Sequence, residues 1–148
     1  MAKQYRITAF SELTSVTVRT LHYYDEIGLL KPTSKTASGH RLYSEYDLLR
    51  LQQITTLKFM GFSLAAIKKL LQPAEFNVNA ALKLQADVLT TQAQRIEQAA
   101  ALLRYTAGQL AENQAVNWYS IAKIIEILEM NNMSNTSFKQ AYSTVEAS

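Results

Sequence analysis

The sequence of 148 residues contains no cysteine, four glycines and two prolines. The absence of cysteine excludes disulfide bonds, zinc-thiolate sites, iron-sulfur clusters and thiol nucleophiles. The sequence also lacks a glycine-rich phosphate loop and a close carboxylate pair in an apolar setting, and its two histidines, His22 and His40, have basic neighbours. We therefore expect no catalytic residue, no metal site and no cofactor, and the protein is not predicted to be an enzyme.

Long hydrophobic runs are absent as well. No window reaches the roughly 18 apolar residues that a membrane helix requires, and no apolar segment of a signal peptide follows Lys3 and Arg6. We therefore expect a cytoplasmic protein without a membrane partner. Its length suits one domain, and 48% of its residues are hydrophobic, which allows a packed core.

Positive charge is concentrated in the first half. Residues 1–75 contain ten Lys or Arg and six Asp or Glu, whereas the remainder contains five and six. An excess of positive charge favours binding to the phosphates of a nucleic acid, although chance variation in the placement of charged residues can also produce such an excess.

The few helix breakers define a helix-turn-helix. Residues 8–13 have the apolar spacing of a short helix, and the turn that follows contains Ser15. Thr17 is a suitable N-cap for a second helix, which is expected to end near Ile27 with Gly28 in the left-handed conformation. Two short helices joined in this way are typical of DNA-binding proteins.

A wing and two further helices are expected next. Residues 29–31 and 41–43 are predicted to pair as short strands around a polar loop that contains Gly39. Ser44 and Ser63 are predicted to cap a third and a fourth helix, which end before Gly61 and Pro73.

Beyond the fourth helix, residues 77–114 show a heptad pattern. Small and large apolar residues alternate along one narrow seam, which consists of Leu82, Ala86, Leu89, Ala93, Ile96, Ala100, Leu103, Ala107 and Leu110. A helix of about 38 residues is roughly 57 Å long, more than a small head can cover, so a second chain is expected to bury the seam. The pattern leaves parallel and antiparallel pairing open. Polar residues such as Gln85, Gln92, Gln94 and Gln98 are expected to occupy the rest of the circumference.

Residues 115–148 form the third segment. One more amphipathic helix is predicted from Val116 to Leu128, and the Asn-rich run that begins at Asn131 is expected to end it. Tyr105, Trp118 and Tyr119 either pack at the helix junction or form a small apolar effector pocket.

The chemistry of the first half points to double-stranded DNA. Arg19 lies in the first turn of the second helix, where a recognition helix presents side chains to the major groove, and His22 and Tyr23 follow on the same side. Tyr24 is as consistent with packing as with DNA contact. The complete predicted interface consists of Tyr5, Thr17, Val18, Arg19, His22, Tyr23, Tyr24, Lys35, His40, Arg41, Tyr43 and Lys58.

Residues 5–73 resemble the MerR family of transcriptional regulators. The resemblance rests on Tyr5-Arg6-Ile7, Val18-Arg19-Thr20-Leu21, Tyr23-Tyr24-Asp25, Ile27-Gly28-Leu29-Leu30, Gly39-His40-Arg41-Leu42-Tyr43 and Leu57-Lys58-Phe59-Met60-Gly61-Phe62-Ser63-Leu64. It implies a mainly α fold, with a winged helix-turn-helix head over residues 5–73, an antiparallel dimerisation coiled coil over 77–114 and a short tail over 115–148. It also implies DNA contacts at Arg19, Tyr23, Tyr24, Arg41 and Lys58.

The same resemblance implies a mechanism. A homodimer would bind a pseudo-palindromic promoter site and distort the spacer DNA so that RNA polymerase engages both promoter elements. A small-molecule effector would bias the switch, but the sequence does not identify one. Two positions depart from the family pattern: His22 stands where arginine is usual, and Ser15 where glycine is frequent, at a strain of about 1 kcal/mol.

Two other classes of protein fit parts of the sequence. An excisionase-like architectural protein would share the winged head and bend DNA without effector control. A coiled-coil interaction protein would carry the basic head incidentally. The long heptad helix argues against the first class, and the second class predicts no salt-sensitive affinity for DNA.

Overall fold

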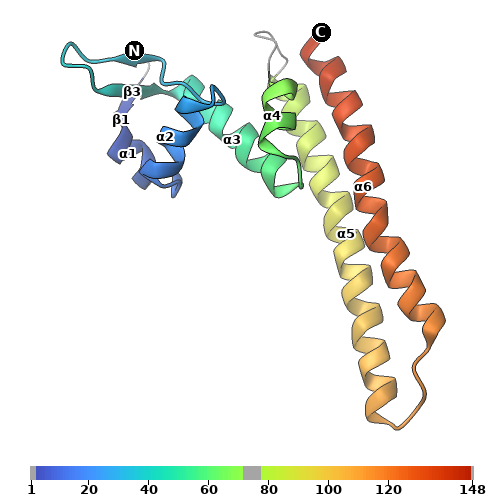
Figure 1. Cartoon of the computed structure of the whole chain (residues 1–148). Coiled ribbons are helices and arrows are strands. Elements are labelled where there is room, and N and C mark those ends of the chain that lie inside the picture. Colours follow the sequence, from blue (N-terminus) through green and yellow to red (C-terminus); the bar gives the residue numbers. More distant parts are fainter. Residues whose placement is uncertain (1–2, 72–77, 148) are drawn as a thin grey trace. The chain divides into compact units, whose positions relative to one another are not determined.

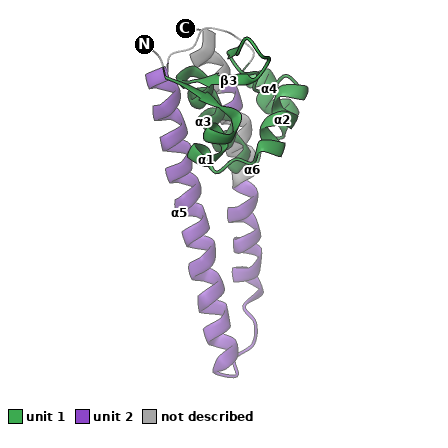
Figure 2. Cartoon of the chain, turned by 90° about the vertical axis from the view of Figure 1, so that its left-hand side faces the viewer, with its two compact units in different colours: residues 1–72 green, residues 73–148 purple. Residues whose placement is uncertain are grey.

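The computed structural model describes residues 3–71 and 78–147, which belong to two compact units. We call residues 1–72 the head and residues 73–148 the hairpin (Figures 1 and 2). No helix within the described residues is long and apolar enough to cross a membrane.

The head combines short helices with a small sheet. Its elements are β1 (Gln4–Arg6), α1 (Ile7–Thr14), α2 (Val18–Glu26), β2 (Ser34–Lys35), β3 (Arg41–Ser44), α3 (Glu45–Phe59) and α4 (Leu64–Leu70). The predicted helix-turn-helix is confirmed. The Thr17 hydroxyl accepts a hydrogen bond from the Thr20 N–H at 3.1 Å, as an N-cap does, and Gly28 follows α2 with φ +74°.

The sheet has the strand order β1-β3-β2, with both pairs antiparallel. The prediction of a strand at residues 29–31 is wrong. The N–H groups of Leu29 and Leu30 both donate to the Tyr24 carbonyl, at 2.8 and 3.1 Å, so this segment closes α2. The first strand of the wing lies further along the chain, at β2. The sequence analysis also missed β1, because three residues are too few for a periodic pattern.

Two interactions hold the head together. The Phe10 and Tyr43 rings stack with centroids 4.5 Å apart, which joins α1 to β3 in the core. The Asp47 carboxylate accepts hydrogen bonds from the Thr33 N–H, the Thr33 hydroxyl and the Ser44 N–H at 2.7–3.0 Å. The last of these completes the capping box at the start of α3 and confirms the cap predicted at Ser44.

The hairpin consists of α5 (Val78–Ala111) and α6 (Trp118–Ala147), which run side by side in opposite directions (Figure 1). The buried side chains of the hairpin, among the described residues, are Ala81, Gln85, Gln92, Ala99 and Thr106 of α5 and Ser120, Ile124 and Ile127 of α6. The expectation that Gln85 and Gln92 face solvent is therefore wrong. A heptad repeat does not reveal which of two adjacent stripes a neighbouring helix covers.

The C-terminal helix is longer than predicted. Helix α6 continues through the Asn-rich run that was expected to end it at Asn131. Asparagine costs a helix only about 0.7 kcal/mol relative to alanine, and no proline or glycine interrupts this stretch. The weak local preference of asparagine is therefore not enough to end the helix.

The predicted dimerisation seam is not covered by α6. Most of its residues directly follow a buried residue of α5, so the seam is rotated from the α6 side by about 100°, the angle per residue of an α-helix. Ile96 is 55% exposed and Leu103 53% exposed, and Leu82 and Leu110 also face solvent. Leu89 and Ala100 are half-buried, whereas Ala86, Ala93 and Ala107 are exposed. The single chain thus leaves an apolar stripe along α5 without a partner helix.

The turn between α1 and α2 yields a stability prediction. Ser15 adopts φ +59°, the left-handed conformation that the sequence analysis expected there. Ser15→Gly should raise the free energy of unfolding by about 0.5–1 kcal/mol, since the strain it relieves exceeds the entropy that glycine loses. Urea-induced unfolding measures the change.

Ser11→Gly, in the middle of α1, is the matched control and should lower the free energy of unfolding by a similar amount. Equal effects of the two substitutions would contradict the strain at Ser15.

Candidate nucleic-acid interface

Helix α2 presents one polar face to solvent. Arg19, His22 and Tyr23 are exposed and have the i, i+3, i+4 spacing of one helix face. Thr17 and Val18 begin the helix beside them. Tyr24 lies on the opposite side, 4% exposed, so the structure gives its ring a packing role and its contact with DNA remains a prediction.

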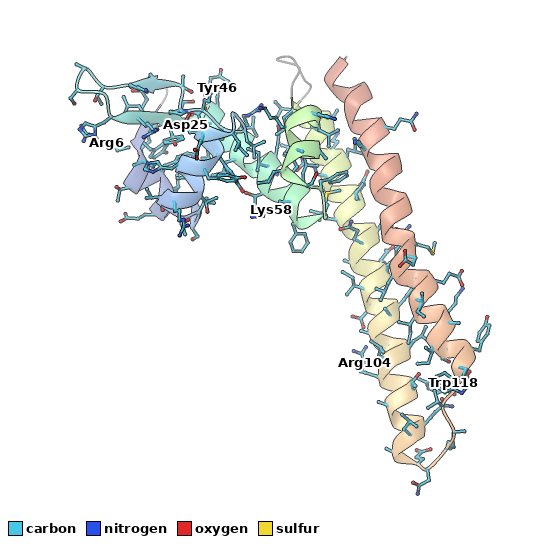
Figure 3. The ribbon with its side chains drawn as sticks, viewed as in Figure 1. Arg6, Asp25, Tyr46, Lys58, Arg104 and Trp118 are labelled. Carbon is cyan, nitrogen blue, oxygen red and sulfur yellow. The ribbon has the colours of Figure 1, made fainter. Side chains whose placement is uncertain are left out.

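An ion pair joins α2 to the wing. Arg41 Nε on β3 donates to Asp25 Oδ2 at 2.7 Å, and Lys31 Nζ lies 3.7 Å from Asp25 Oδ1 (Asp25 is labelled in Figure 3). The hydrogen bond from Arg41 is the main reason that the pKa of the Asp25 carboxyl lies below its ordinary value of 3.8. The Arg41 side chain is still 37% exposed, so its guanidinium is positioned by Asp25 and remains accessible to a ligand.

A polar cavity of about 370 Å³ opens between the start of α1, α2 and the wing. Its lining includes four nitrogen-rich side chains, Arg6, His22, His40 and Arg41, and no acidic residue. A cavity with this lining suits an anion such as a phosphate group. Sequence reasoning missed Arg6 as a site residue, because its position at the end of β1 became apparent only once β1 paired with β3 (Figure 3).

The wing carries some, but not all, of its predicted contacts. Lys35 on β2 and His40 before β3 are exposed. Tyr43 is fully buried, and its hydroxyl has no hydrogen-bond partner among the described residues. Burial raises the pKa of this hydroxyl above 10.0. Tyr43 is therefore a core residue, and we correct its assignment to the DNA surface. Strand alternation places every second residue inward, and the sequence did not reveal which face of β3 is the inner one.

Two predicted contacts lie outside α2 and the wing. Lys58 is exposed at the end of α3 (Figure 3). Tyr5 is half-buried on β1, and Lys3 Nζ lies 5.6 Å from the centroid of its ring. Both side chains reach the surface of the head and are compatible with contact to DNA.

The residues of the predicted effector pocket are all exposed. Tyr105 of α5 and Trp118 and Tyr119 of α6 are between 56% and 77% exposed, so the single chain does not enclose a pocket with them. An effector site at this position would need a further surface to cover the rings, and it stays a prediction. The described residues contain no group of three or more His, Asp or Glu side chains that could hold a metal ion.

The Asp25–Arg41 pair yields a pH prediction. Asp25→Asn should lower the free energy of unfolding at neutral pH by about 1–2 kcal/mol, because a partly exposed charge-assisted hydrogen bond is lost. The pKa of Asp25 is lowered in the folded protein, so the stabilisation is present above its ordinary pKa. It should disappear as the pH falls below 3.8, where the wild type and the variant should converge. Unfolding curves at several pH values measure the difference.

Glu12→Gln, at an exposed carboxylate of α1, is the control and should change the free energy of unfolding little at neutral pH. A difference between wild type and Asp25→Asn that persists at low pH would contradict the role of the carboxylate charge.

Comparisons with known proteins match this geometry. The model of the MerR HTH family regulatory proteins matches residues 5–73. The crystal structure of the HTH-type transcriptional regulator SkgA from Caulobacter crescentus is 34% identical, and the match covers 81% of this chain and 86% of that chain with a TM-score of 0.69. HiNmlR, a MerR family regulator lacking the sensor domain and bound to promoter DNA in its crystal structure, has a similar fold. Its TM-score is 0.56 at 22% identity, over 74% of this chain and 92% of that chain.

A longer relative is similar to part of this chain. The HTH-type transcriptional activator mta of Bacillus subtilis is 43% identical over 95 residues, which cover 64% of this chain and 37% of that protein. The chain therefore spans well under half of the length of this relative. Because the likeness to SkgA extends over most of both chains, and the head has the helix-turn-helix and the sheet described above, the chain belongs to the MerR family of DNA-binding transcriptional regulators.

Proposed function

We propose that the protein binds promoter DNA as a homodimer and regulates transcription from that promoter. The observation that carries this proposal is the combination of an exposed polar face on α2 with the cavity that contains Arg6, His22, His40 and Arg41. The first presents groups for base edges, and the second suits a backbone phosphate. The names of the relatives support regulation of transcription as the outcome.

In this proposal, α2 enters the major groove and the wing follows the adjacent backbone. Arg19 lies in the first turn of α2, where recognition helices reach base edges and phosphates, and Tyr23 follows one turn later on the same face. Lys35, Arg41 and Lys58 supply positive charge around it. His22, in place of the usual arginine, offers a shorter side chain with fewer donors, so one contact differs from the family pattern.

The seam of α5 supports the homodimer. Its alternation of large and small residues is complementary to itself when two copies run antiparallel, because Ile96 of one copy then lies opposite Ala100 of the other. In a parallel pair, large residues would face large and alanines would face alanines, which packs a helix interface less evenly. A dimer with a two-fold axis would bind a pseudo-palindromic site.

We further propose that the dimer distorts the promoter spacer and thereby controls engagement of RNA polymerase. This step rests on membership of the family, and the promoter DNA in the HiNmlR structure is consistent with it. An architectural DNA-bending protein is disfavoured because the relatives are named as regulators.

Removal of the Arg19 side chain tests the DNA-reading face. Arg19→Ala should weaken binding to the preferred site by about 1–3 kcal/mol and relax the preference at one base pair. Selection of duplexes from a random pool defines the site, and fluorescence anisotropy measures affinity for it and for a scrambled duplex.

Lys69→Ala, at an exposed lysine of α4, is the control and should weaken both duplexes only slightly. Equal weakening by Arg19→Ala on both duplexes would assign Arg19 to a phosphate. Failure of the wild type to prefer any sequence would contradict the proposed function.

Charges in the seam test the dimer. Leu89→Glu combined with Ile96→Glu should give monomers that lose tight DNA binding, because carboxylates would be buried in an apolar interface. Gln94→Glu combined with Ala101→Glu, on an exposed side of α5 outside the seam, is the control and should leave the dimer intact. Sedimentation equilibrium measures the association, and a dimer that survives the seam charges would contradict the assignment.

A further inference from the structure

We propose that α6 is part of the dimer interface, because an exposed apolar stripe on it continues the seam of α5 and is covered by the second copy. The stripe consists of the exposed residues Ile125 and Leu128 and of Ile121, which is half-buried and also packs against the core of the hairpin. This inference rests on the proposed homodimer and deepens it: the dimer would bury two helices from each chain instead of one. Ile125 is 57% exposed and Leu128 45% exposed in the single chain.

The stripe and the seam lie on the same side of the hairpin. On α6, the buried residues Ser120, Ile124 and Ile127 are each followed by one of the stripe residues. On α5, the buried residues are each followed in the same way by a seam residue. One residue turns a side chain by about 100° in both helices.

The sense in which side chains rotate about each helix axis determines on which side of the hairpin the seam and the stripe lie. Viewed along α5 from its N-terminus, successive side chains rotate in one sense about the helix axis. Helix α6 runs toward the viewer, so its successive side chains rotate in the opposite sense (Figure 1). The buried faces of the two helices point toward each other. A step of one residue in each helix therefore brings both apolar stripes to the same side of the pair.

The other side of the hairpin is polar over the same stretch. The residues that precede the buried ones on α6 include Lys123 and Glu126, which form an ion pair at 3.3 Å. Their counterparts on α5 include Thr91 and Gln98, which are exposed. Nearer the loop this side also carries the exposed rings of Tyr105 and Tyr119. Level with Ile125 and Leu128 it is polar, so at that level only the apolar side resembles an uncovered helix interface.

The stripe lies level with the middle of the seam. Arg95 Nη1 donates to the Met130 carbonyl at 3.2 Å, and Ala99 packs with Ile124 and Ile127. In the antiparallel pairing of Ile96 with Ala100 of the other copy, the two-fold axis passes at this level. Leu128 of one copy would then approach Leu128 of the other across the axis.

The chemistry of this side favours a second copy as its occupant. The seam contains only leucine, isoleucine and alanine, so it offers no charge to an ionic partner. Its heptad spacing fits another helix with the same spacing, and each chain supplies such a helix. The stripe on α6 widens this self-complementary face and is continuous with it.

Charges on the stripe test the inference. Ile125→Glu combined with Leu128→Glu should raise the dissociation constant of the dimer at least tenfold in sedimentation equilibrium. Ala122→Glu combined with Met130→Glu, on exposed positions of α6 outside the stripe, should change it less than twofold. Circular dichroism verifies that both variants keep their helix content.

The outcomes separate this inference from the proposed function. A wild type that is monomeric at the concentrations where it binds DNA would overturn the homodimer itself. A dimeric wild type that loses association with the seam charges, but keeps it with the stripe charges, would overturn only the role of α6.

A cross-link gives a second test that does not depend on destabilising the dimer. Since the chain has no cysteine, Leu128→Cys introduces a single thiol, and oxidation should give a disulfide-linked dimer. Ala122→Cys, on the far side of α6, should give little disulfide-linked dimer. A Leu128→Cys variant that sediments as a dimer, but cross-links no more than Ala122→Cys, would overturn the inference.

Discussion

The ion pair between Asp25 and Arg41 connects the two parts of the head that face DNA in the proposed function. Helix α2 and strand β3 are separated along the chain by residues 27–40, and a hydrogen bond of 2.7 Å between the Arg41 and Asp25 side chains connects the two elements. The cavity lined by Arg6, His22, His40 and Arg41 exists because these two elements and the start of α1 meet there. A surface that reads both bases and phosphates needs such a fixed spacing between its parts.

The second constraint lies in α5, which packs against α6 on one face and leaves the seam exposed on another. The buried face of α5 contains Gln85, Gln92 and Thr106, whereas the seam, which is displaced from this face by one residue, is entirely apolar. The helix thus places its polar residues at the contact within the chain and its most hydrophobic residues on an uncovered face. The burial of those hydrophobic residues by a second copy would contribute the larger hydrophobic free energy.

Local chemistry accounts for the elements that the sequence analysis predicted correctly. The caps at Thr17, Ser44 and Ser63 and the left-handed residues Ser15 and Gly28 depend on neighbours within a few positions. The predictions that were wrong extend over longer stretches of the chain. The placement of the first wing strand depended on the return of Leu29 and Leu30 onto α2. The length of α6 exceeds the prediction because the Asn-rich run does not end the helix.

The sequence by itself determined the family, the helix-turn-helix, the exposed face of α2 and the periodic seam of α5, because each is a pattern of neighbouring residues. Only the tertiary structure decided that Tyr24 and Tyr43 are core residues, that Arg6 joins the cavity and that Asp25 positions Arg41. Those outcomes depend on which faces meet after the chain has folded, and residues far apart in the sequence determine which faces those are.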